Sequence, residues 1–291
     1  MFKKIFQIAF SAGFALLASL AQAQVGNVTG NLGTTCSATG VGGAAAKTMA
    51  DDGACTFTPT VYKISIFEMG LCTENPFGAA QDGASFNRTN CVTTYEDETP
   101  AVVDIAPALG GTPIALTGTS TPPAENTYTH AYLILDDTFT VAGSFTAGDG
   151  TVYVSQNDGS STTSNLGSIQ EASSDLTNFG DGGIGNSDCE SGFLNVPVSA
   201  GTISGFITNT ALERSDKQGG AVANVCTNRG KLTGVLTLTT PVVVTSDTLQ
   251  VIFNFSLTNQ GVQFFDDANN SGVPDQFGSG PFSGSFTIVN K

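Results

Sequence analysis

The chain has 291 residues and a formal net charge of −15, with 10 lysine and arginine residues against 25 aspartate and glutamate residues. Proteins that bind nucleic acid or an anionic membrane surface gather lysine and arginine on one face, so this composition argues against both kinds of partner. An acidic surface favours solubility and the binding of divalent cations.

Residues 1–23 have the organisation of a secretory signal peptide. Lys3 and Lys4 form a basic start, the apolar stretch 5–20 follows, and residues 21–23 (AQA) fit the small-residue cleavage pattern. No later apolar run reaches the roughly 20 residues that a transmembrane helix needs. The sequence therefore predicts a secreted bacterial protein without a transmembrane segment, extracellular or on the cell surface, with the periplasm as the alternative location.

The chain contains six cysteines, an even number that predicts disulfides in an oxidising compartment. Short loops lose the least entropy on closure, so we expect sequence neighbours to pair. A thiolate metal site is the alternative, but the sequence has no C-x-x-C motif and only one histidine, His130. The expected disulfides are Cys36–Cys55, Cys72–Cys91 and Cys189–Cys226.

Alternating apolar and polar residues recur along the whole chain after the signal peptide. In residues 249–257 (LQVIFNFSL) five apolar side chains fall on one face, which is typical of a half-buried strand. Further strand patterns occupy 60–67, 127–135, 138–145, 151–156 and 231–240. The Asp-Gly pair within 147–150 predicts a hairpin between two of these strands. We therefore expect an all-β fold, an antiparallel β-sandwich with Greek-key or jelly-roll-like connections, in one large unit or two tandem units.

Residues 156–190 are polar, rich in glycine and serine, and without a clear strand pattern. Such a segment predicts a linker or a long loop. It would separate an N-terminal β domain, 24–155, from a C-terminal β domain, 191–291. A single large sandwich remains the alternative.

Residues 267–275 (DANNSGVPD) carry oxygen-bearing side chains at alternate positions. Calcium prefers six to eight oxygen ligands, and this spacing turns alternate side chains toward one centre. The stretch resembles the calcium loops of thrombospondin type 3 repeats, dockerins and EF-hands. It departs from the EF-hand at Gly278, where that loop has a bidentate glutamate, and a plain turn is the alternative. The expected ligands of a structural calcium ion are Asp267, Asn269, Ser271, the Val273 carbonyl and Asp275.

The sequence shows no catalytic constellation. His130 lies in a strand pattern with no partner at a recognisable spacing, and the G-x-S-x-G nucleophile motif is absent. Adjacent acidic residues on a strand point to opposite faces, which makes them poor catalytic pairs. Phe264 and Phe265 are consistent either with the core or with an exposed patch for assembly.

These features favour a non-enzymatic structural protein that assembles with itself, as a filament, surface-layer or matrix subunit, or that adheres to surface glycans or proteins. Unpaired strand edges would join the subunits. The alternatives are a β-sandwich that binds a glycan or small ligand, which would need a concave aromatic-lined pocket, and a secreted hydrolase, which would need convergent carboxylates in a cleft.

Overall fold

The computed structural model describes residues 7–8, 34–36, 54–110, 114, 116–147, 150–163, 165–179, 189–198, 200–218, 221–222, 225–265, 273–280 and 282–291. Across these residues the fold is an all-β sandwich, which confirms the predicted class. The helical segments described are the 3-10 turn η1 (Ala106–Gly110) and the single-turn helix α1 (Ser215–Gln218). No helix in this part of the chain is long and apolar enough to cross a membrane.

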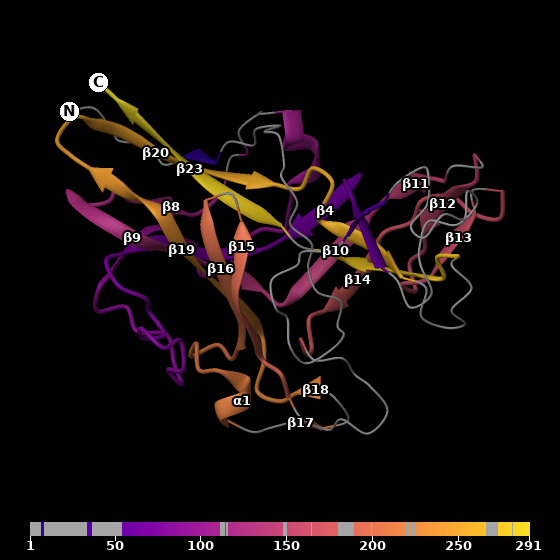
Figure 1. Ribbon diagram of the computed structural model, residues 1–291, viewed down its shortest axis with the longest axis horizontal. Helices are drawn as coiled ribbons and strands as arrows, with labels where there is room; N and C mark the ends of the chain where they lie inside the picture. The colour runs from indigo at the N-terminus through magenta and orange to yellow at the C-terminus, as the bar shows by residue number, and fades with distance from the viewer. Residues whose placement is uncertain are drawn as a thin grey trace.

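One layer of the sandwich is a seven-stranded antiparallel sheet, on the left in Figure 1. Its two longest strands are neighbours at the centre, and the strands at both edges are shorter. The strands in spatial order are β15 (Gly192–Val198), β16 (Gly201–Thr208), β19 (Lys231–Val244), β9 (Asn126–Asp136), β5 (Ile66–Cys72), β6 (Cys91–Glu96) and β8 (Thr119–Ser120).

The opposing layer consists of three smaller sheets. The first is formed by β14 (Ala172–Asp175), β10 (Thr138–Ala142), β4 (Val61–Ile64) and β7 (Val103–Asp104). The second is formed by β2 (Thr34–Thr35), β3 (Ala54–Phe57), β21 (Val262–Phe265) and β22 (Gln276–Ser279). The third is formed by β1 (Gln7–Ile8), β20 (Thr248–Ser256) and β23 (Ser283–Asn290).

Two further small sheets lie at the margins. A hairpin and a third strand form the lobe at the right of Figure 1, β11 (Ser144–Thr146), β12 (Val152–Ser155) and β13 (Ser161–Thr163). The predicted turn between β11 and β12 is confirmed, with Gly150 N donating to the Ala147 carbonyl at 2.9 Å. The other small sheet is the pair β17 (Ala221–Val222) and β18 (Val225–Cys226).

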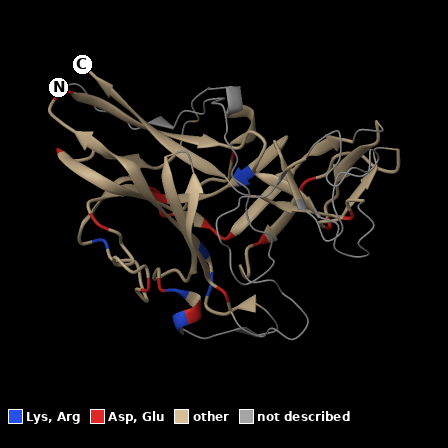
Figure 2. Cartoon of the chain, in the orientation of Figure 1, with Lys and Arg blue, Asp and Glu red and all other residues tan. Residues whose placement is uncertain are grey.

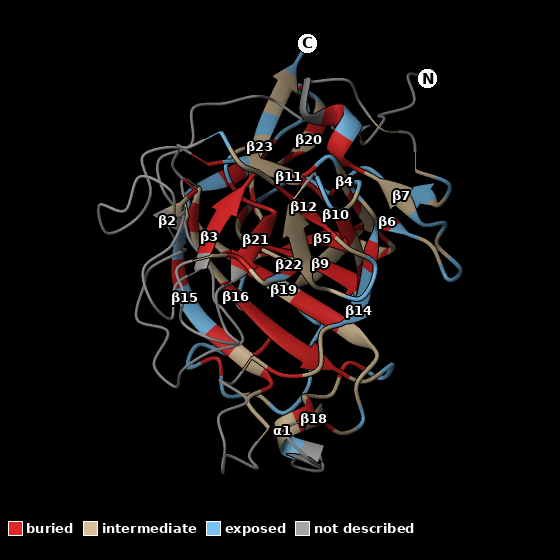
Figure 3. Ribbon diagram, turned by 90° about the vertical axis from the view of Figure 1, so that its right-hand side faces the viewer, coloured by how far each residue is buried: buried red, intermediate tan, exposed pale blue. Residues whose placement is uncertain are grey.

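The main hydrophobic core includes the face of β3, β21 and β22 that packs against the lobe of β11 and β12, where the ring of Phe57 lies 6.3 Å from that of Phe145 and the ring of Phe264 lies 6.4 Å from that of Tyr153. Phe264 of β21 has no exposed surface, and its ring stacks on that of Phe57 with centroids 4.7 Å apart. Phe277 of β22 packs against both rings, at 5.5 Å from Phe264 and 6.1 Å from Phe57. Figure 3 shows β3 and β21 among the buried strands. Phe264 is therefore a core residue, not part of an exposed patch.

Strands from both expected domains share one sheet. The seven-stranded sheet combines β5, β6, β8 and β9 from residues 24–155 with β15, β16 and β19 from residues 191–291. The segment 156–190 itself contributes β13 and β14, and β14 pairs with β10. The sheets therefore extend across the domain boundary that we expected at residues 156–190. The segment is polar because Ser173, Ser174 and Asp175 lie exposed on an edge strand.

All three expected disulfides are confirmed: Cys36–Cys55, Cys72–Cys91 and Cys189–Cys226. The second joins directly opposed residues of β5 and β6 and closes the long connection 73–90. The third ties the chain before β15 to β18. Three disulfides fit an oxidising compartment.

The expected signal peptide, residues 1–23, lies outside the described residues except for Gln7–Ile8. These two residues form β1, which pairs in parallel with Ile252 and Phe253 of β20. The cleavage position is therefore not tested by the fold.

Replacing Phe264 with alanine is expected to lower the free energy of unfolding by about 3–5 kcal/mol, because it leaves a cavity beside the rings of Phe57 and Phe277. Leu166→Ala is the control: Leu166 is 82% exposed, so its removal should change stability by less than about 0.5 kcal/mol. Urea unfolding of both variants measures the difference. Equal losses in the two variants would contradict this account of the core.

Candidate functional site

Two glycines face each other in adjacent central strands of the seven-stranded sheet. Gly205 of β16 pairs with Gly234 of β19. A Cβ atom added at Gly234 would meet nothing closer than the Leu133 carbonyl oxygen, at 3.9 Å. The space over Gly205 is instead taken by the ring of Phe193 from edge strand β15. A glycine inside a strand commonly marks a place where another group approaches the backbone, and here Gly234 leaves the inner face of the sheet uncovered.

A cavity of about 240 Å³ lies over this uncovered patch, between the two layers. Leu133, Leu232 and Leu236 of the central strands line it together with the glycines. Aromatic residues from the opposing layer and from edge strands complete its wall. They are Phe139, Phe179, Phe193, Phe253, Phe282 and Phe286. The lining is predominantly apolar, and such a cavity can take up an apolar guest.

A small polar group interrupts this lining. Tyr62 of β4, Gln263 of β21 and Ser279 of β22 all contribute to the cavity wall. The Tyr62 hydroxyl lies 3.3 Å from Ser279 Oγ and 3.4 Å from the Gly280 carbonyl oxygen. Gln263 Nε2 donates to the Ser279 carbonyl at 3.1 Å. Burial raises the pKa of Tyr62 far above its usual range, partly offset by the Ser279 hydroxyl, so this phenol stays neutral. Tyr62, Gln263 and Ser279 thus form a polar site in a mostly apolar wall.

The cavity reaches the surface beside β14. Its lining includes Ser174 and Asp175, which are exposed, and the Asp175 carboxylate accepts hydrogen bonds from Thr138 Oγ1 at 2.8 Å and Arg229 Nη2 at 3.3 Å. The neighbouring chain is held by Cys226 N, which donates to the Thr177 carbonyl at 2.8 Å. The Cys189–Cys226 disulfide therefore anchors one side of the opening, which lies between edge strands of the two layers.

The chain matches no family model, and it has no significant similarity to a curated protein or to a solved structure. The chemistry of the site therefore follows from its own geometry: an apolar cavity, one polar site and an opening.

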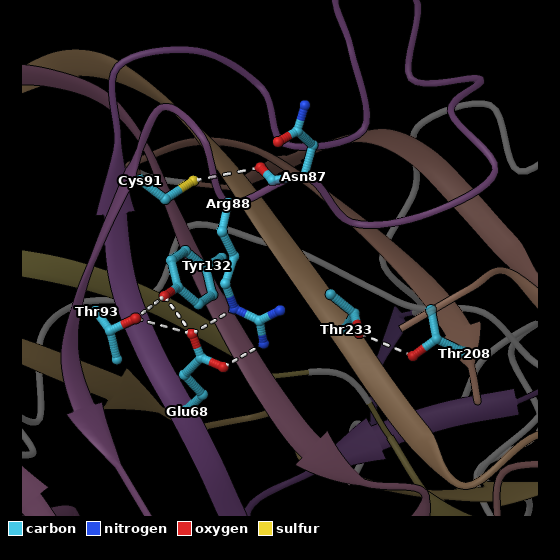
Figure 4. A network of polar contacts seen from close by, with 8 residues as sticks. All are labelled: Glu68, Asn87, Arg88, Cys91, Thr93, Tyr132, Thr208 and Thr233. Atoms are coloured by element: carbon cyan, nitrogen blue, oxygen red, sulfur yellow. Dashed lines mark hydrogen bonds and ion pairs between the residues drawn. The ribbon is translucent and has the colours of Figure 1, made fainter. Parts of the chain in front are cut away.

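A second polar cluster lies on the outer face of the seven-stranded sheet (Figure 4). Glu68 of β5 accepts hydrogen bonds at Oε1 from the Tyr132 hydroxyl (2.6 Å) and from Thr93 Oγ1 (3.0 Å). Arg88, from the connection 73–90, pairs with the same carboxylate through Nε at 3.2 Å and Nη2 at 2.6 Å. Burial raises the pKa of Glu68, but the hydrogen bonds from Arg88, Tyr132 and Thr93 outweigh it, so the pKa lies below its usual value. The ionised carboxylate fixes the connection to the sheet.

The hydrogen bonds of this outer cluster have a structural role. Both oxygens of the Glu68 carboxylate already accept a hydrogen bond, and Arg88 donates to that carboxylate through Nε and Nη2. Phe86 of the same connection packs edge-on against Tyr132, with ring centroids 4.9 Å apart. The cluster is accounted for by its role in holding residues 73–90 against the sheet.

His130 lies on the outer face of β9, where Cys72 and Thr237 are its cross-strand neighbours. Its Nδ1 is 2.9 Å from Thr129 Oγ1, and burial lowers its pKa. Among the described residues no carboxylate forms a hydrogen bond with it, so the structure supplies no acid–base pair around this histidine.

Three of the expected calcium ligands, Asp267, Asn269 and Ser271, lie outside the described residues. The two others precede β22, where the Asp275 carbonyl accepts from Ser161 N at 3.0 Å. In the part of the chain that is described, no three acidic, histidine or cysteine side chains come together as a metal site. The calcium site stays a prediction.

Glycines inside strand patterns are the one feature of the sequence that could have indicated the cavity. Gly205 and Gly234 interrupt two strand patterns, GTISGFIT and KLTGVLTL, in which no turn is expected. Their direct opposition depends on the register of two strands almost 30 residues apart, which the sequence does not reveal. Gln263, between two core residues, carried a similar signal as a polar residue in an apolar run.

The Glu68 cluster should make stability depend on pH. Because the folded-state pKa of Glu68 is depressed, its contribution is present above the ordinary glutamate pKa of about 4.3 and is lost as pH falls through the folded value. Tyr132→Phe removes one donor and should lower the free energy of unfolding at pH 7 by about 1–3 kcal/mol.

Urea unfolding between pH 3 and pH 7 tests this expectation. The deficit of Tyr132→Phe should shrink as the pH falls through the depressed folded-state pKa of Glu68, since the carboxylate is then protonated in both proteins. Tyr128→Phe is the matched control, since the Tyr128 hydroxyl donates to the neutral Ala124 carbonyl at 2.8 Å. The decrease in the free energy of unfolding that this variant causes should be independent of pH in this range. A constant deficit for both variants would contradict the assignment.

Proposed function

We propose that this protein is exported and binds a small, largely apolar molecule in the cavity between its two β layers. The observation that carries the proposal is the uncovered inner face at Gly234 in a cavity lined by six phenylalanines. This is the aromatic-lined pocket that a small-ligand-binding sandwich requires. The three disulfides and the signal-peptide pattern support export.

The size of the cavity limits the ligand. An engineered apolar cavity of about 150 Å³ accommodates benzene, so a cavity of about 240 Å³ suits a molecule of roughly ten non-hydrogen atoms. That is the size of a substituted single ring or a short branched chain. A glycan chain is much larger and more polar, which disfavours the glycan-binding alternative for this cavity.

The test is binding of propylbenzene and 4-propylphenol to the purified chain 24–291, measured by calorimetry and by the shift in melting temperature. Gly234→Leu places a side chain in the cavity and should abolish binding of both compounds. The variant should itself fold, because a Cβ at this position would meet no atom closer than 3.9 Å.

Thr237→Leu is the matched control, since it adds the same side chain to the same strand on the outer face, opposite His130. It should leave binding unchanged. If neither compound binds the unmodified protein, or if Gly234→Leu binds them as well as Thr237→Leu does, the proposed function is wrong.

Self-assembly, as a filament, layer or matrix subunit, is a second candidate function, supported by the ribbon of β20 and β23. Among the described strands, β23 pairs only with β20, and the other edge of β20 is covered only by Gln7–Ile8 of the expected signal peptide. Removal of that peptide would leave both edges open. Neither strand contains a charged residue or a proline, as Figure 2 illustrates for charge. Charge and proline are the usual protection of an edge.

Edge strand β15 has such protection, with Pro197 and a register shift between Phe193 and Val196. The contrast marks the β20–β23 ribbon as the place where a second copy of the chain would add a strand. The calcium loop at 267–275, just before β22 and β23, would fix the position of this ribbon when the ion is bound.

Sedimentation and electron microscopy of residues 24–291, with calcium and with a chelator, test this second candidate. Val289→Lys puts a charge on the β23 edge and should leave only monomers, whereas Val102→Lys, at a residue that is 65% exposed just before β7, should assemble normally. Asp267→Ala should remove the effect of calcium. A monodisperse monomer at high concentration with and without calcium would exclude assembly.

A further inference from the structure

We infer that the ligand of the cavity is a neutral molecule that carries one hydrogen-bond donor, a hydroxyl or an N–H group, and that Gln263 Oε1 accepts this hydrogen bond. The inference rests on the proposed ligand-binding function and adds to it the chemical class of the ligand.

Gln263 is a polar residue in an apolar part of the fold. Its neighbours in β21, Val262 and Phe264, have no exposed surface and point into the main core. Because side chains alternate along a strand, Gln263 points to the other face, and it lines the cavity. Only 2% of its surface is exposed.

The Gln263 side chain is held in one orientation. Its Nε2 donates to the Ser279 carbonyl oxygen, which can only accept, so the amide nitrogen must face β22. Its Oε1 is then on the opposite side of the amide, where no described residue donates to it. A buried acceptor without a donor costs about 1–3 kcal/mol, so such atoms are rare and call for a partner.

The neighbouring hydroxyl groups do not supply this partner. The Tyr62 hydroxyl lies within reach of Ser279 Oγ and the Gly280 carbonyl. Ser279 Oγ is 3.3 Å from the same Gly280 carbonyl. Both hydroxyl hydrogens therefore have acceptors next to them, and the one interaction that the site lacks is a donor for Gln263 Oε1.

The same arrangement excludes an anionic ligand. Gln263 lines the cavity beside the carbonyl-bound hydroxyls, and the described residues of the cavity wall include no lysine or arginine. A carboxylate placed there would face acceptors and lose its hydration without compensation. A neutral phenol, alcohol or amide of roughly ten non-hydrogen atoms satisfies both the volume and the missing donor.

The experiment compares three ligands of matched shape by calorimetry: 4-propylphenol, 4-propylanisole and propylbenzene. The phenol donates a hydrogen bond, the anisole has an oxygen that can only accept, and propylbenzene has neither. We expect the phenol to bind at least about tenfold more tightly than the other two, although it is the most strongly hydrated in water.

Gln263→Leu removes the acceptor while keeping a similar volume, and it should reduce the preference for the phenol over propylbenzene to about one. Gln260→Leu is the matched control. Gln260 is also buried, at 4% exposure, but its Nε2 donates to Ser256 and Ser283, and it does not line the cavity. The control should keep the full preference if it folds.

The outcomes separate this inference from the proposed function. Equal affinity of the three ligands for the unmodified protein would overturn the inference and leave the proposed function standing, since a water would then satisfy Gln263. The ligand comparison alone gives this result if Gln263→Leu fails to fold. Binding of none of the three would overturn the proposed function itself.

Discussion

The spacing between two face-to-face β layers is the constraint on which the rest of this structure depends. Packed sheets lie about 10 Å apart, and side chains from both inner faces must fill the space between them. Over Gly234 one sheet contributes no side chain, so part of the space between the two layers stays unfilled. The cavity follows from that mismatch.

The fold class and the disulfides were predictable because both depend on local information. Apolar and polar residues alternate within each strand, and cysteines that are neighbours in the sequence close short loops. The domain organisation was not predictable in the same way, because it depends on which distant strands pair. Residues 156–190 appeared to be a linker because an edge strand such as β14 can be polar on several successive residues. Sheet membership is a property of the partner strand, and a polar sequence alone does not exclude it.

The candidate site was less accessible from the sequence than the fold. Each of its features is ordinary when considered alone: a glycine in a strand, a glutamine between apolar residues, a tyrosine in another strand. Their meaning comes from the register that sets Gly205 opposite Gly234 and from the arrangement that brings Tyr62 beside Ser279, 217 residues away. The calcium loop is the opposite case, since its pattern is conspicuous in the sequence and three of its five residues lie outside the described part of the chain.

A void of this size is expensive enough to require an explanation. At about 24 cal/mol per Å³, a closed and dry cavity of about 240 Å³ would cost on the order of 6 kcal/mol, which is an upper bound for a cavity that opens to the surface, against a typical net stability of only about 5–15 kcal/mol. A side chain at position 234 could begin to fill the cavity, since a Cβ there would meet no atom closer than 3.9 Å, yet the position is glycine. The buried acceptor of Gln263 adds a second unfavourable contribution at the same place. A ligand that filled the cavity and donated a hydrogen bond to Gln263 would remove both unfavourable contributions. The three disulfides would stabilise the fold when the ligand is absent.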